Sequence, residues 1–320
     1  MLKLGPLKLK SRVIQSPMAG CSDLAFRLMG RRYGMEFAFL EMVSAEALVR
    51  RNRKTLEMLK STEEDRPLGA QLVGSKPPVM AEAAGMLEAM GFDWIDLNLG
   101  CPVPKVIASG SGSHLLREPD LTETILKAMR KNVKKIPFTI KMRVGFTDPS
   151  GAEAIEIAKR AETAGVDGIT VHGRTRQQGY GGKANWETIG KVKKAVKIPV
   201  IGNGDIYSSE DLTDKLTVSG VDGVMIARGA LGNPWIYRSL EKTMAGKPAP
   251  PPPSFEERKK AALQHLKLEV EIEGEKLGVL KSRKIICWYF KKFPRVARFR
   301  DQINRAVTAP EMEHIICQYQ

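Results

Sequence analysis

Short apolar runs alternate with amphipathic segments over the first 230 residues of the chain. Eight runs have the length and composition of β-strands, at residues 13–18, 37–42, 68–73, 94–99, 138–144, 168–172, 199–203 and 223–227. Segments between them, such as 78–90 and 152–164, have helical periodicity and are followed by a glycine suited to a helix C-cap. Eight strand–helix repeats predict an α/β fold of the (β/α)8 TIM-barrel type. The alternative is an open doubly wound sheet, but no G-x-G-x-x-G motif follows the first strand.

The pattern changes after residue 240. A run of Lys-Pro-Ala-Pro-Pro-Pro-Pro-Ser covers residues 247–254 and is incompatible with a helix or a central strand. Ser254 followed three residues later by Glu257 is typical of a helix start, and helical periodicity continues beyond it. We therefore expect a catalytic barrel over 1–240, a linker over 241–254 and a small all-helical domain over 255–320, with helices at 258–272 and 280–290.

The charge of the chain indicates what kind of partner the helical domain binds. The 320-residue chain has a formal net charge of +15 and a pI of about 9.6, which indicates a polyanionic partner. Between Lys276 and Arg305, ten basic residues accompany one acid, Asp301. We expect the basic residues to face the partner. The aromatic residues among them are expected to form the core of the domain, and they are Trp288, Tyr289, Phe290, Phe293 and Phe299.

Several functional classes are disfavoured by what the sequence lacks. The four cysteines form no C-x-x-C pair and have no metal-ligand spacing with the four histidines, so we expect neither a bound metal nor a disulfide framework. No run approaches the length of a membrane span, and the first twenty residues lack the apolar core of a signal peptide. We therefore expect no membrane association and a cytoplasmic location.

The chemistry is expected at the carboxyl ends of the strands, which a barrel brings onto one face. The run at 94–99 alternates apolar and polar residues and then stops at Gly100-Cys101-Pro102. A cysteine there is either a buried structural residue or a reactive thiol. The following stretch, 103–116, is polar and rich in glycine and carries Lys105. This composition suits a loop that closes over a substrate, and it favours the reactive thiol.

Other strand ends carry groups suited to a flat heterocycle. The small residues at 16–20 allow the backbone to approach a ring, although a simple turn explains them better when they are taken alone. Gln71 offers an amide that can bond a carbonyl and an N–H together. Lys141 points inward between apolar neighbours, which is costly for an ammonium without an electron-rich partner. His172 is followed by Arg174 and Arg176, a pattern that suits an anion or a heterocycle.

The last two strands indicate a phosphate site. Asn203, Gly204 and Asp205 follow the seventh strand, and the segment from Ala227 to Gly229 follows the eighth. The loops after strands seven and eight of a barrel commonly bind phosphate through backbone N–H groups, and Arg228 adds charge-assisted hydrogen bonds. A phosphate site, a flat-ring site and a cysteine on the opposite wall together predict bound FMN.

These motifs, in this order, resemble the tRNA-dihydrouridine synthase family. The resemblance covers about residues 10–235 and continues weakly into the tail, and it rests on Pro17-Met18-Ala19-Gly20, Leu97-Asn98-Leu99-Gly100-Cys101-Pro102 with Lys105-Val106, Lys141-Met142-Arg143, Val171-His172-Gly173-Arg174-Thr175, Gly202-Asn203-Gly204-Asp205 and Ala227-Arg228-Gly229. It implies an FMN-binding TIM barrel with a C-terminal tRNA-binding helical domain. The implied reaction uses NADPH to reduce chosen uridines of tRNA to 5,6-dihydrouridine.

The resemblance also implies roles for individual residues. Cys101 is the expected acid, giving a proton to C5 of uracil after hydride from reduced FMN reaches C6. The expected FMN contacts are Pro17, Met18, Ala19, Gln71, Lys141, His172, Asn203, Gly204, Asp205, Ala227, Arg228 and Gly229. The expected substrate contacts are Asn98, which would touch the uracil, and Lys105, Arg174, Arg176, Arg283, Lys284 and Lys291.

Two departures from the family pattern concern the choice of substrate. His114 stands where the family usually has a small residue, beside the loop that carries the cysteine. In the tail, Lys281-Ser282-Arg283-Lys284 keeps the bases of the family's basic patch but not its histidine. The modified position in tRNA, activity on ribosomal RNA and the choice between NADPH and NADH are therefore left open, and a monomer is expected.

Two other functions fit parts of the pattern. A flavin barrel acting on a free pyrimidine, as in relatives of dihydroorotate dehydrogenase, would not need the basic tail. An RNA-binding protein on an inactive barrel would be expected to have lost the cysteine or the lysine, and both Cys101 and Lys141 are present.

Overall fold

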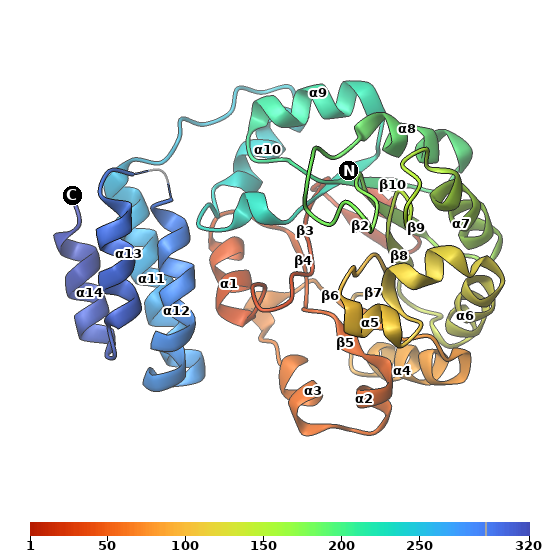
Figure 1. The fold of residues 1–320 in the computed structure, drawn as a ribbon, viewed down its shortest axis with the longest axis horizontal. Coiled ribbons are helices and arrows are strands. Elements are labelled where there is room, and N and C mark those ends of the chain that lie inside the picture. Colours follow the sequence, from red (N-terminus) through yellow and green to blue (C-terminus); the bar gives the residue numbers. More distant parts are fainter. Residues whose placement is uncertain (292) are drawn as a thin grey trace.

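A computed structural model describes residues 1–291 and 293–320 and shows a barrel followed by a group of helices (Figure 1). In these residues the strands are β1 (Leu2–Leu4), β2 (Leu7–Leu9), β3 (Val13–Gln15), β4 (Phe37–Phe39), β5 (Val43–Ser44), β6 (Leu68–Val73), β7 (Trp94–Leu99), β8 (Phe138–Arg143), β9 (Gly168–His172), β10 (Val200–Asn203) and β11 (Gly223–Ile226). Parallel pairings run from β4 through β3, β11, β10, β9, β8 and β7 to β6, and pairing of β4 with β6 closes the ring. The predicted TIM barrel is confirmed.

The strands agree with the predicted runs to within one residue, except at two carboxyl ends. β3 stops at Gln15 rather than at residue 18. The Ser16 N–H still donates to the Ile226 carbonyl at 2.8 Å, and the backbone after it leaves the ladder and lines a pocket. β4 stops at Phe39 rather than at residue 42, and the two-residue β5, just beyond the predicted run, pairs with β6. Both differences lie at the mouth of the barrel, where loops replace regular pairing.

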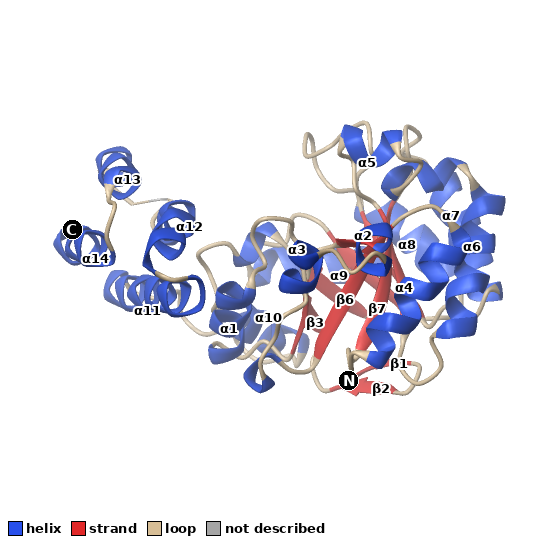
Figure 2. Cartoon of the chain, turned by 90° about the horizontal axis from the view of Figure 1, so that it is seen from below, coloured by secondary structure: helices blue, strands red, loops and turns tan. Residues whose placement is uncertain are grey.

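An N-terminal hairpin, β1 with β2, closes the other end of the barrel and has no counterpart among the predicted strands. Leu2, Leu4 and Leu9 pack into one buried cluster with inward-facing aromatic residues, including Trp94 and Phe37. Figure 2 shows this hairpin at the end of the barrel opposite to α5 (Pro104–Ala108). Ligands can therefore reach the barrel interior only from the carboxyl ends of the strands.

Helices surround the barrel and bury their apolar faces against the outside of the strands. They are α1 (Leu24–Arg32), α2 (Ala45–Val49), α3 (Arg53–Met58), α4 (Pro77–Ala89), α6 (Pro119–Asn132), α7 (Ala152–Thr163), α8 (Trp186–Ala195), α9 (Ser209–Ser219) and α10 (Ile236–Met244). Short 3-10 turns occupy Glu63–Asp65, Gly112–Arg117 and Arg228–Ala230. The predicted helices at 78–90 and 152–164 correspond to α4 and α7.

An extended segment follows α10 and leads to the C-terminal helices α11 (Phe255–Glu273), α12 (Glu275–Tyr289), α13 (Val296–Arg305) and α14 (Ala309–Gln318). The helix α10 runs to Met244, so it continues past residue 240, where the sequence places the start of the linker; the prolines begin only at Pro248. Ser254 and Glu257 form the reciprocal capping box that the sequence predicts. The helices at 258–272 and 280–290 correspond to α11 and α12.

The aromatic residues of the tail are mainly core. Tyr289, Phe290 and Phe299 are buried, and Phe293 and Trp288 pack partly buried against them. The same cluster includes Ala25, Leu28 and Met29 of α1, so the C-terminal helices share their core with a barrel helix. Lys292, one of the ten basic residues counted in the sequence, lies outside the described residues.

None of the helices in the described residues is long and apolar enough to span a bilayer. Within the same residues, no group of three or more His, Cys, Asp or Glu side chains is arranged to hold a metal ion.

The barrel and the tail lie in close contact at Gly232, and this contact makes a testable prediction. Gly232 has φ of 67°, and an added Cβ would overlap the backbone of Trp288 in α12. We expect Gly232→Ala to cost about 1–2 kcal/mol for the left-handed backbone and about 1–3 kcal/mol more for the overlap. Urea unfolding measures the sum.

Gly246→Ala is the matched control, because Gly246 also has φ of 67° but a Cβ there meets nothing within 4 Å. Equal losses of stability in the two variants would show that the tail does not press on the barrel at Gly232.

Candidate active site

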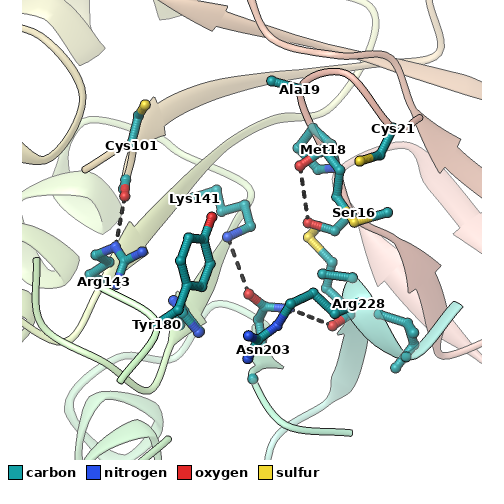
Figure 3. Close-up of a pocket in the computed structure, with 18 of the residues that line it drawn as sticks. Ser16, Met18, Ala19, Cys21, Cys101, Lys141, Arg143, Tyr180, Asn203 and Arg228 are labelled. Carbon is teal, nitrogen blue, oxygen red and sulfur yellow. Dashed lines mark hydrogen bonds between the residues drawn. The ribbon is translucent and has the colours of Figure 1, made fainter. Parts of the chain in front are cut away.

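A pocket of about 500 Å3 opens at the carboxyl ends of the barrel strands. Its size is typical of small-molecule sites. In Figure 3, Cys101 lies on one side of the pocket, Met18 and Ala19 lie on the other, and Lys141, Tyr180 and Asn203 lie between them. Barrel closure therefore gathers residues from segments that are far apart in the sequence.

Cys101 is held by its backbone on both sides. Its N–H donates to Asn98 Oδ1 at 2.8 Å, and its carbonyl accepts from the Ser113 hydroxyl at 2.9 Å. Gly112 packs so closely that an added Cβ would lie 3.0 Å from the Cys101 carbonyl oxygen. The glycine-rich loop thus fixes the cysteine backbone, and the side chain, only 8% exposed, lines the pocket.

A row of hydrogen bonds crosses the barrel interior below the cysteine. Asn98 Nδ2 donates to Gln71 Oε1 at 2.8 Å, and Gln71 Nε2 donates to Asp96 Oδ2 at 2.7 Å. The other Asp96 oxygen accepts from the Thr139 hydroxyl at 2.5 Å. Burial raises the pKa of Asp96 to about 6, although the two hydrogen bonds and Lys141 oppose this rise.

Lys141 brings a nearly unpaired ammonium into the pocket. Among the described residues, its only hydrogen-bond partner is Asn203 Oδ1, at 3.3 Å. Burial lowers the pKa of Lys141 to about 8, and neighbouring Arg143 acts in the same direction. The ammonium is therefore charged at neutral pH and has N–H groups left for an electron-rich ligand.

His172, which also lines the pocket, is not a second cation. Burial lowers its pKa well below the usual value, and the charges of Lys141, Arg143, Arg174 and Arg228 lower it further. A neutral imidazole can still donate one N–H to a ligand.

The loops after β10 and β11 form a second end of the pocket. Asp205 Oδ2 accepts from Arg174 Nη2 at 2.7 Å and from the Ala184 N–H at 2.8 Å, and Arg228 Nη2 lies 3.2 Å from Asp205 Oδ1. Burial opposes ionisation of Asp205, but these donors outweigh it and lower the pKa of the carboxyl. Gly204, with φ of 126°, lies against His172 and leaves no room for a side chain.

Comparison with known proteins identifies the family. The model of the family "Dihydrouridine synthase (Dus)" matches residues 14–319. A probable tRNA-dihydrouridine synthase of Rickettsia bellii is 42% identical over 95% of this chain and 93% of its own length. The tRNA-dihydrouridine synthase B of Pseudomonas aeruginosa is 39% identical over 95% of this chain and 91% of its own. This chain belongs to the dihydrouridine synthase family. The family is one of flavin-dependent oxidoreductases.

Solved structures support the fold. A 2-naphthoyl-CoA reductase complex superposes with a TM-score of 0.58, covering 77% of this chain and 52% of that chain at 14% identity. A histamine dehydrogenase from Rhizobium sp. 4-9 superposes with a TM-score of 0.57, covering 83% and 50% at 14% identity. At such identity these likenesses concern only the barrel architecture.

Most of the residues that the sequence nominated lie together. The pocket is lined by Cys101, by Asn98, and by the expected cofactor contacts Pro17, Met18, Ala19, Gln71, Lys141, His172, Asn203, Gly204, Asp205, Ala227, Arg228 and Gly229. The Asp205 carboxylate is already bonded to Arg174 and Ala184, so in this structure it holds the loop rather than offering free acceptors.

The expected substrate contacts other than Asn98 lie outside the pocket wall. Lys105 is exposed on α5, and Arg176 lies over the Phe146 ring at 5.2 Å. Arg283 donates to the Ala306 carbonyl at 2.9 Å within the tail. Lys284 donates to the Gly20 carbonyl, beside the pocket loop, and Lys291 lines a groove that adjoins the pocket.

Arg174, which the sequence analysis expects to contact the substrate, does not line the pocket and is engaged by other groups of the protein. It is 2% exposed, pairs with Asp205 and donates to the carbonyls of Gly181 and Gly182. Its Nε and Nη2 groups therefore hold the loop after β9, whereas its buried Nη1 has no hydrogen-bond partner among the described residues.

Some residues of the site were missed in the sequence. Asp96 and Arg143 each lie two positions from a nominated residue on the same strand, and this period-2 spacing could have placed them on the inner face. Arg143 donates to the Gly100, Thr175 and Gly179 carbonyls and so joins the cysteine loop to the loop after β9. Tyr180, on that loop, and Met42 carried no sequence signal.

The two arginines after His172 should respond differently to the same substitution. Arg174→Met leaves Asp205 without its buried partner and is expected to cost about 3 kcal/mol or more. Arg176→Met removes only a contact with the Phe146 ring and is expected to cost about 0.5–1 kcal/mol. Urea unfolding of both variants measures this. A larger loss from the Arg176 variant would contradict the structural role of Arg174.

Proposed function

We propose that the protein is an FMN-dependent tRNA-dihydrouridine synthase that uses NADPH to reduce the C5=C6 bond of specific uridines. The observation that carries this proposal is the juxtaposition of a thiol and an unneutralised cation across one pocket. Family membership gives the reaction class, and the relatives named above are described as acting on tRNA.

The residues present fit FMN. The Lys141 ammonium has spare donors, which suits the electron-rich edge of the flavin ring. Arg228, 41% exposed in its side chain, and the glycine-flanked backbone at 204 and 229 suit a phosphate. When bound, FMN would supply hydride from its reduced form. Gln71, His172 and Asn203 would orient the ring, while Pro17, Met18 and Ala19 would pack against it.

Cys101 is the proton donor in this proposal. Reduction of uracil places negative charge at C5 and at the C4 oxygen, and a proton must then reach C5. A thiol is ordinarily protonated at neutral pH, and the fixed backbone of Cys101 holds its sulfur at the pocket. Asn98, which also lines the pocket, would contact the uracil.

A groove between the barrel and the tail suits RNA. Its volume is about 1680 Å3, and it shares Arg228, Gly229 and Tyr207 with the pocket. Cations and aromatic rings both line it, a combination typical of surfaces that bind unstacked RNA. The further lining residues of these two kinds include Arg31, Arg32, Tyr33, Trp235, Arg238, Arg258, Trp288, Lys291 and Phe293.

The pocket alone would also accept a free pyrimidine, and the groove favours RNA instead. A target uridine must leave its stack to reach the pocket, which costs a few kcal/mol, and phosphate contacts in the groove would offset that cost. The choice of NADPH, a monomeric state and a cytoplasmic location stay predictions.

Replacing the Cys101 thiol should slow the reduction of uridine in tRNA without affecting the reduction of the flavin by NADPH. Cys101→Ala is expected to lower the rate of dihydrouridine formation by about 100-fold or more, because it removes a positioned acid. Flavin content and reduction of the flavin by NADPH should stay as in the wild type. Stopped-flow absorbance and mass spectrometry of digested tRNA measure the two steps.

Cys21→Ala is the control, because Cys21 also lines the pocket but on the side of the Met18 loop. Dihydrouridine formation at the wild-type rate by the Cys101 variant would remove this cysteine from the mechanism.

Charge reversal in the groove should weaken tRNA binding. Lys291→Glu is expected to lower affinity about tenfold and to flatten the dependence of log Kd on log salt, because a phosphate contact is lost. Lys267→Glu, an equal charge change on an exposed lysine that does not line the groove, should have a much smaller effect. Equal affinities of these two variants would argue against the groove.

A further inference from the structure

The hydrogen bonds that connect Asn98, Gln71 and Asp96 beneath Cys101 allow only one assignment of donors and acceptors. At the upper end of this row, the Gly100 and Cys101 N–H groups are donors, at 3.0 and 2.8 Å, so the Asn98 oxygen must face them. Asn98 Nδ2 then faces Gln71 and requires the Gln71 oxygen as acceptor. Gln71 Nε2 consequently faces Asp96. Flipping either amide would set donor against donor.

Asp96 provides the acceptor at the lower end of the row. Its side chain is 1% exposed, and both oxygens accept hydrogen bonds, from Gln71 on β6 and from Thr139 on β8. The Thr139 hydroxyl in turn accepts from the indole N–H of Trp94 at 2.6 Å, so its own hydrogen is committed to Asp96. The charged group that acts on Asp96 is Lys141, also on β8.

We propose that Asp96 is a positioning residue for the reaction: as a carboxylate, it fixes the orientation of the Gln71 and Asn98 amides and thereby the place of the Cys101 backbone. This inference rests on the proposed function. Asp96 does not line the pocket, so it acts through Gln71 and Asn98 rather than by touching the substrate.

The fixed direction also leaves a defined group for substrate recognition. Asn98 Nδ2 has two hydrogens, and one of them is used by Gln71. The other contact of this nitrogen is Met42 Sδ at 3.6 Å, a weak acceptor that itself lines the pocket. An N–H donor therefore faces the pocket, and it suits a ring carbonyl of uracil rather than the amino group of cytosine.

The substitution Asp96→Asn keeps the shape of the side chain, but neither orientation of the new amide satisfies all of the hydrogen bonds in the row. If the oxygen of the introduced amide accepts from Gln71, the amide N–H must face Thr139, and the Thr139 hydroxyl hydrogen loses its acceptor. If that oxygen instead accepts from Thr139, the introduced N–H faces the Gln71 N–H. A flip of Gln71 then conflicts with Asn98, which the backbone of residues 100 and 101 holds in place.

The test is the single-turnover reduction of tRNA uridine by the pre-reduced FMN holoenzyme and by Asp96→Asn. We expect the rate constant to fall about tenfold or more in the variant with little change in tRNA Kd, because a displaced reacting group costs rate rather than affinity. Asp167→Asn is the control. Asp167 also accepts two hydrogen bonds, from Arg130 and the Phe138 N–H, but it lies before β9 at the opposite end of the barrel.

The pH profile distinguishes positioning from general stability. Protonation turns one of the two acceptor oxygens of Asp96 into a donor, so Gln71 and Thr139 can no longer both donate to it, and the wild-type rate should fall as pH decreases through about 6. The Asp96 variant should be slow but nearly independent of pH between about 5 and 7. The wild-type profile needs no mutant, so it tests the inference even if the variant does not fold.

Four outcomes are informative. A slow variant with a flat profile supports the inference. A variant as fast as the wild type, or a wild-type rate unchanged through pH 6, overturns it. Failure of the wild-type enzyme itself to reduce tRNA uridine would refute the proposed function, on which this inference depends.

Discussion

Closure of the barrel is the constraint on which the rest of the structure depends. Pairing of β4 with β6 completes the ring and brings the carboxyl ends of all its strands to one rim. The N-terminal hairpin fills the opposite end with leucines, so the polar interior opens in one direction only. Along β7, the inner face accordingly changes from Trp94, which packs in the hairpin cluster, to the polar Asp96 and Asn98 toward the mouth.

Electrostatics follow from this burial. The interior holds the cations of Lys141 and Arg143, whereas both oxygens of Asp96, the carboxylate whose charge acts on Lys141, accept hydrogen bonds from neutral donors. Desolvation lowers the pKa of Lys141 and keeps His172 neutral. A pocket with excess positive charge and spare donors is costly when empty, and binding of an electron-rich, anionic ring would relieve that cost. The same logic explains why Arg174 and Asp205 neutralise each other beside the pocket.

The strands that depend on a local pattern of residues could be predicted from the sequence. The features that depend on contacts between distant residues were missed. The strands β6, β7 and β9 match their apolar runs at both ends, because glycine, proline or charge stops each run. The hairpin was missed because its leucines alternate with lysines in two very short strands. Arg174 and Arg176 look alike in the sequence, and only the position of Asp205, far along the chain, separates them. Arg283 likewise looks like a free cation in the sequence, although its guanidinium donates to the Ala306 carbonyl in the structure.

The central claim is that one pocket holds both the flavin and a uridine of tRNA. The most direct measurement is an anaerobic titration of the reduced holoenzyme with tRNA that lacks dihydrouridine, followed by counting dihydrouridine formed per flavin oxidised. The account predicts one dihydrouridine for each flavin, with no oxidation by free uracil at the same concentration. A flavin that stays reduced in the presence of tRNA, or that a free pyrimidine oxidises as readily, would contradict it.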